Sequence, residues 1–69
     1  MKSHRHKGQV TLAAFKMIRA LDDRRFGITV DELANEIGRG KRTAYRFIAA
    51  AQEAGVPLWK DEDGRWRLA

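Results

Sequence analysis

One short stretch of this chain is rich in arginine and lysine, and the side chains of both residue types suit the recognition of a polyanion. Arg39, Lys41, Arg42 and Arg46 fall close together, and residues 38–52 contain neither aspartate nor glutamate. The planar fork of arginine can donate to guanine O6 and N7 together, whereas lysine offers a point charge to phosphate oxygens. This stretch has the chemistry of a nucleic-acid contact, although runs of exposed cations are often only solvated faces.

The apolar residues of the same stretch recur with helical spacing. Positions i, i+3, i+4 and i+7 are occupied by Ala44, Phe47, Ile48 and Ala51. This spacing predicts a helix over about 41–54 that ends before Gly55. The residues opposite the apolar stripe are Arg42, Tyr45, Arg46 and Ala49. The cations therefore project outward from the N-terminal half of the predicted helix.

Each candidate residue is assigned a role from its side-chain chemistry. We expect Arg42 and Arg46 to read base edges, and Lys41, Thr43 and Tyr45 to hold the phosphate backbone. The complete candidate DNA-binding set is Arg39, Gly40, Lys41, Arg42, Thr43, Tyr45 and Arg46.

Two more helices are predicted before this one. Apolar residues on one side of a helical wheel predict a helix over about 9–23, and they are Val10, Ala14, Met17, Ile18 and Leu21, with Phe15 flanking them. Thr29 and Glu32 have the spacing of a capping box, so a short second helix begins at Val30 and closes at Gly38. A tight glycine-containing turn between the second and third helices predicts a helix-turn-helix unit.

The residues after the third helix change to the pattern of a β-hairpin. Segments 56–60 and 65–68 flank a turn that contains Asp-Gly, and Leu58, Trp66 and Leu68 are expected to face the helices. The predicted fold class is therefore mainly α with a small β-hairpin: a winged helix-turn-helix of three helices plus a two-stranded wing. Residues 9–69 form this domain, and residues 1–8 form a flexible basic arm.

Length and composition limit the classes of function. The 69 residues carry 14 Lys+Arg against 9 Asp+Glu, a net charge of +5, and no cysteine. A chain this short buries only about 60% of its unfolded surface, so we expect no autonomous enzyme and no cofactor. The absence of thiols and of a membrane-spanning apolar run favours a cytoplasmic protein without a membrane partner.

Other features are weighed against plainer interpretations. We expect Trp59 and Trp66 to pack the hairpin onto the helices rather than to stack on single strands. His4 and His6 are too few for a metal site, and the segment 38–41 lacks the residues of a phosphate-binding loop. The acidic tip at 61–63 is expected to stay clear of a duplex or to face a protein.

Three blocks of this sequence resemble the N-terminal winged helix of bacterial WYL-domain transcriptional regulators of the DeoR-like type. The blocks are GITVDELA at 27–34, RTAYRFI at 42–48 and EAGVPL at 53–58, within a similarity that spans about residues 9–68. The resemblance implies sequence-directed binding of double-stranded DNA, with a recognition helix around Arg42 to Arg46 in the major groove. Four positions depart from the family pattern: Arg39, Gly40, Phe47 and Ala51.

The resemblance also concerns a domain that follows the winged helix in this family. Regulators of this family continue into a sensing WYL domain, so this chain is either an excised DNA-binding domain or a small free-standing relative. The resemblance implies dimerisation mainly through the absent portion, so we expect a monomer or weak dimer in isolation. The alternative function is a protein-interaction winged helix that docks an acidic partner.

Overall fold

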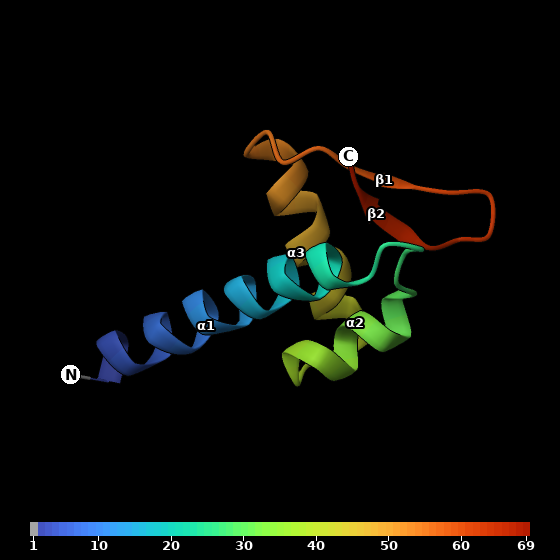
Figure 1. Ribbon diagram of the computed structural model, residues 1–69. Coiled ribbons are helices and arrows are strands. Elements are labelled where there is room, and N and C mark those ends of the chain that lie inside the picture. The colour runs from blue at the N-terminus through green and yellow to red at the C-terminus, as the bar shows by residue number, and fades with distance from the viewer. Residues whose placement is uncertain (1) are drawn as a thin grey trace.

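The described residues fold as three helices followed by a two-stranded antiparallel hairpin (Figure 1). The computed structural model describes the backbone of residues 2–69 and the side chains of residues 10–69. The elements are α1 (Lys2–Asp23), α2 (Val30–Ile37), α3 (Lys41–Glu53), β1 (Leu58–Lys60) and β2 (Trp66–Leu68). This order confirms the expected winged helix-turn-helix layout.

Helix α1 begins earlier than its apolar pattern predicts, at Lys2 rather than near residue 9. Backbone hydrogen bonds can extend a helix into a segment without an apolar stripe, and the single Gly8 opposes this by only about 1 kcal/mol. Met1 and the side chains up to residue 9 lie outside the described part of the chain. The flexible basic arm over residues 1–8 therefore stays a prediction.

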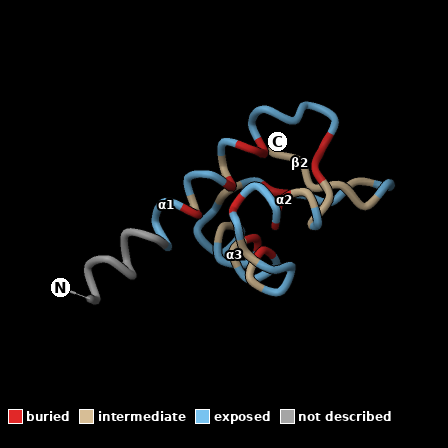
Figure 2. The backbone as a smooth tube through the Cα atoms, turned by 90° about the horizontal axis from the view of Figure 1, so that it is seen from below, coloured by how far each residue is buried: buried red, intermediate tan, exposed pale blue. Residues whose placement is uncertain are grey.

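The buried side of α1 is rotated from the predicted one. Met17 and Leu21 are buried as expected, but Ala13 and Ala20 join them, whereas Val10 and Phe15 are exposed. Ala13 lies near Ile37, and Ala20 lies near Glu36, so the small side chains face α2. Because alanine allows two helices to approach closely, the apolar core includes Ala13 and Ala20, which the size of their side chains alone would not predict. Buried residues lie on all three helices and also at Ile28 and Leu58. Figure 2 marks these buried stretches in red.

The start of α2 has the predicted capping box. The Glu32 amide donates to Thr29 Oγ1 at 3.1 Å, and the Thr29 amide donates to Glu32 Oε1 at 2.9 Å. Gly38, with φ of 69°, closes the helix in the left-handed conformation. The chain then passes through Arg39 and Gly40 into α3, which completes the helix-turn-helix.

The hairpin packs one face on the helices and exposes the other. Leu58 pairs with Leu68, Trp59 with Arg67 and Lys60 with Trp66, and Ile28 adds a bridge to Trp66. Leu58 is buried, and Trp66 and Leu68 pack against the core as expected. Trp59 does not, because strand alternation places it on the outer face, where the Arg67 guanidinium lies 5.7 Å from its ring centroid.

Candidate nucleic-acid interface

The outward face of α3 presents basic side chains to solvent. Arg42, Tyr45 and Arg46 are exposed, while Ala44 and Ile48 on the opposite side are buried. In the described part of the chain, no carboxylate lies within ion-pair distance of Arg39, Arg42 or Arg46. These guanidinium groups are therefore available to a ligand.

The N-terminus of α3 also leaves backbone donors available. Gly40 occupies the N-cap position with φ of −77° and ψ of 167°, and none of the described side chains caps the helix. The amides of the first turn have no partner within a helix, so water or an anion can accept from them. Gly40 is exposed, and a ligand can approach its backbone closely.

Lys41 differs from the neighbouring arginines because it has an acidic neighbour on α2. Its Nζ lies 3.5 Å from Asp31 Oδ1, and both side chains are well exposed. An exposed pair of this kind contributes about 0–1 kcal/mol, so phosphate could replace the carboxylate at little cost.

Arg39, Thr43 and Arg46 are brought together along one flank of α3. They line a shallow cleft of about 380 Å³ with Val10 from α1 and with Phe47 and Ala50 from α3. Arg39 also lines a second hollow with Lys16. Lys16 was missed by the sequence reasoning, because only the packing of α1 on the helix-turn-helix brings it near the turn at 38–40.

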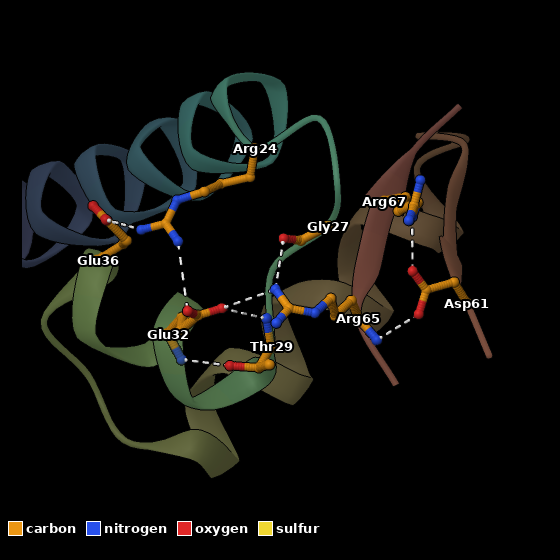
Figure 3. Close-up of polar contacts among 8 residues, drawn as sticks. All are labelled: Arg24, Gly27, Thr29, Glu32, Glu36, Asp61, Arg65 and Arg67. Carbon is orange, nitrogen blue, oxygen red and sulfur yellow. Dashed lines mark hydrogen bonds and ion pairs between the residues drawn. The ribbon is translucent and has the colours of Figure 1, made fainter. Parts of the chain in front are cut away.

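An ion-pair network joins the loop after α1, the start of α2 and the hairpin (Figure 3). Glu32 lies 3.6 Å from Arg24 Nη1 and 3.9 Å from Arg65 Nη1, and Arg24 also contacts Glu36 at 3.2 Å. The amide of Thr29 contributes most to holding the pKa of Glu32 below its ordinary value, with smaller contributions from Arg24 and Arg65. This network links the wing to the first turn of α2.

Asp61 organises the tip of the hairpin. Its carboxylate accepts from the Arg65 amide at 2.8 Å and from Arg67 Nε at 2.7 Å (Figure 3). It also accepts from the amide of Asp63 at 2.9 Å. Its side chain is only 9% exposed, and the hydrogen bond from the Arg65 amide is the largest cause of its lowered pKa. The acidic tip thus exposes two carboxylates, Glu62 and Asp63, while the third is engaged within the turn.

Two other expectations concern metal binding and membrane spanning. Within the described residues, no group of three potential metal ligands converges, and the side chains of His4 and His6 lie outside that part of the chain. No described helix combines the length and the apolarity needed to span a bilayer.

The three helices, the tight turn before α3 and the hairpin define the winged helix-turn-helix class of fold. Comparisons with protein-family models, with curated proteins and with solved structures found no match to this chain. The function must therefore be inferred from the chemistry and the position of the residues described above.

Proposed function

We propose that this chain binds double-stranded DNA in a sequence-directed manner, as the DNA-binding domain of a bacterial transcriptional regulator. Helix α3 would enter the major groove, which is wide enough to admit one α-helix. The observation that carries the proposal is the exposed face of α3, where Arg42 and Arg46 stand one helical turn apart and no carboxylate of the described side chains lies within ion-pair distance. Such a domain would act in the bacterial cytoplasm.

The candidate residues have distinct roles in this proposal. Arg42 and Arg46 would donate to base edges, and Lys41, Thr43 and Tyr45 would hold phosphates beside the free amides of the first turn of α3. Gln52 supports the same helix from its other end, because its Nε2 donates to the carbonyl of Leu58 at 3.2 Å. The wing is thereby held next to α3, while its exposed carboxylates Glu62 and Asp63 would stay clear of the duplex.

The first test is a titration of duplex DNA by fluorescence anisotropy at several salt concentrations. We expect affinity to fall steeply with salt, because each phosphate contact releases a condensed counterion. Arg42→Ala and Arg46→Ala should each weaken binding to a preferred site by roughly 5- to 150-fold, as expected for loss of about 1–3 kcal/mol.

Arg25→Ala is the matched control, because Arg25 is an exposed arginine in the loop before α2. It removes the same charge but should change affinity by less than about twofold if it makes no phosphate contact. Equal losses of duplex affinity for Arg42→Ala, Arg46→Ala and Arg25→Ala would contradict the roles assigned to Arg42 and Arg46. Binding that resists salt and unlabelled duplex would instead favour docking of an acidic protein.

A further inference from the structure

Lys16 on α1 is a cation to which the proposed function assigns no role. It borders a hollow of about 170 Å³ together with Arg39, and the other lining residues are Leu12, Ala13 and Ile37. Lys16 is exposed, and no carboxylate of the described side chains lies within ion-pair distance of it or of Arg39. Two cations from different elements therefore meet at a hollow with no acidic residue in its described lining.

Arg39 connects this hollow to the outward face of α3. It also lines the cleft of about 380 Å³ that Arg46 borders from α3, and none of the described residues that line this cleft is acidic. The sequence adds no acid from the N-terminal side, because its first acidic residue is Asp22. Lys16, Arg39 and Arg46 thus form a basic band that runs from α1 across the turn before α3 to α3 itself.

The basic band ends at Lys16, because acidic residues lie on the other side of this lysine. A third hollow there is lined by Lys16, Arg19, Ala20, Asp23, Arg24 and Glu36. The carboxylate of Glu36 lies 3.2 Å from Arg24 Nη2, so it is engaged with a cation on that side. Arg19, one turn beyond Lys16, therefore borders a surface of mixed charge rather than the basic band.

A row of cations without acids fits one strand of the DNA backbone. Each phosphate along the strand bears a negative charge, and lysine and arginine donate to its oxygens. A helix in the major groove has one such strand on either side. The basic band lies on the side of α3 where Val10 of α1 borders the cleft, so it would meet the strand on that side.

We propose that Lys16 and Arg39 bind neighbouring phosphates of one DNA strand, at the edge of the groove that α3 enters. This role rests on the proposed function of α3, and it gives Arg39 a backbone phosphate rather than a base as its ligand. The contacts do not depend on base sequence, since every nucleotide carries a phosphate. They fix the register of α3 in the groove, because they hold a second element, α1, on the backbone.

The salt dependence of binding to one fixed duplex, measured by fluorescence anisotropy, tests the phosphate contact. Lys16→Ala should lower the affinity roughly three- to tenfold at low salt, and it should make the slope of log affinity against log salt shallower by about 1. Both effects arise because the complex releases fewer counterions when one phosphate contact is lost. Lys16→Arg should keep the slope of the unaltered chain, since the positive charge is retained.

Arg19→Ala is the matched control, because it removes an exposed cation from the same helix, one turn away, where Asp23 and Glu36 border the surface. It should leave the salt slope unchanged. The temperature of thermal unfolding should be the same for all three variants, since Lys16 and Arg19 are both exposed. Equal changes of slope for Lys16→Ala and Arg19→Ala would overturn the proposed contact, because they would report net charge alone.

Single methylphosphonate substitutions, which remove the charge of one phosphate, locate the contact on the preferred duplex. One substitution should weaken binding by the unaltered chain but not by Lys16→Ala, in which that contact is already lost. The phosphate found in the same way for Arg39→Ala should be the same one or its neighbour on the same strand. Two phosphates on opposite strands, or no phosphate coupled to Lys16, would overturn the proposal.

Failure of the proposed function gives a different result. A chain that binds no duplex overturns the proposed function, and the backbone contact of Lys16 with it. Duplex binding that weakens in Arg42→Ala but keeps its salt slope in Lys16→Ala overturns only the contact of Lys16 and Arg39 with the backbone.

Discussion

The carboxylate of Glu32 takes part in three contacts at the same time. It completes the capping box with Thr29, and it lies within ion-pair distance of Arg24 and Arg65. The first of these contacts is local and follows from spacing in the sequence. The other two depend on how the loop and the hairpin come together in space, so they could not be predicted from the sequence.

Gly27 is the residue where the loop before α2 comes closest to the wing. A Cβ built there would lie 2.7 Å from Arg65 Cβ, and the φ of 92° disfavours any side chain. Gly27→Ala should lower the free energy of unfolding by about 2–4 kcal/mol, through backbone strain plus the clash. Gly55→Ala isolates the strain, because Gly55 has the same φ and nothing within 4 Å, and it should cost about 1–2 kcal/mol. Equal losses in urea unfolding would show that the close approach to Arg65 does not matter.

At the scale of the elements, patterns among nearby residues predicted the helices and the hairpin, whereas the buried side of α1 was predicted only in part. The second and third helices, the capping box and the hairpin follow from residues only a few positions apart. The buried side of α1 does not, because Ala13 and Ala20 are selected by contact with α2 rather than by their own hydrophobicity. The roles of Arg42 and Arg46 stay predictions, although the structure exposes both side chains.

Helix α3 can be stabilised at its N-cap. Gly40 has an extended backbone that serine adopts without strain, and a Cβ would meet nothing within 4 Å. Gly40→Ser should raise the free energy of unfolding by about 0.5–1 kcal/mol, through a new cap and a less flexible unfolded chain. Thermal unfolding measures the gain. Gly40→Ala is the control, and a gain as large as that of serine would argue against the capping contribution.

In the proposed DNA complex, Asp31 on α2 would compete with phosphate for Lys41, because its Oδ1 lies 3.5 Å from Lys41 Nζ. Asp31→Asn removes this carboxylate, so duplex affinity at low salt should rise by roughly two- to fivefold while the gain fades at high salt. Glu62→Gln is the control, because it removes the same charge from the wing tip, and its effect should be smaller. A larger gain for Glu62→Gln would place the wing tip, rather than Lys41, closer to phosphate.

At the scale of the whole molecule, charge also sets the response to acid. The pKa values of Asp61 and Glu32 are lowered from ordinary values of 3.8 and 4.5, so folding favours their ionised forms. Their contribution to stability is complete above those ordinary values and is lost as the pH falls through the lower folded values. Stability should therefore be level above about pH 5.5 and decline below about pH 4.5. Urea unfolding across this range should show a shallower decline for Asp61→Asn.

The net charge of +5 arises from an uneven distribution. The helix-turn-helix carries arginines that pair with no carboxylate among the described residues, whereas Arg65 and Arg67 near the wing are engaged with Glu32 and Asp61. The arginines of the helix-turn-helix could be predicted from the sequence, because residues 38–52 lack acids. The pairing of Arg67 with Asp61 could not be predicted, because it depends on the geometry of the hairpin turn.

Selection from a pool of randomised duplexes, followed by sequencing of the bound fraction, tests the central claim most directly. The proposed function predicts a recovered motif whose specificity relaxes at one position in Arg42→Ala and at another in Arg46→Ala. Arg25→Ala should recover the motif of the unaltered chain. A bound fraction with no sequence preference, or a motif unchanged by both α3 variants, would contradict base recognition by this helix.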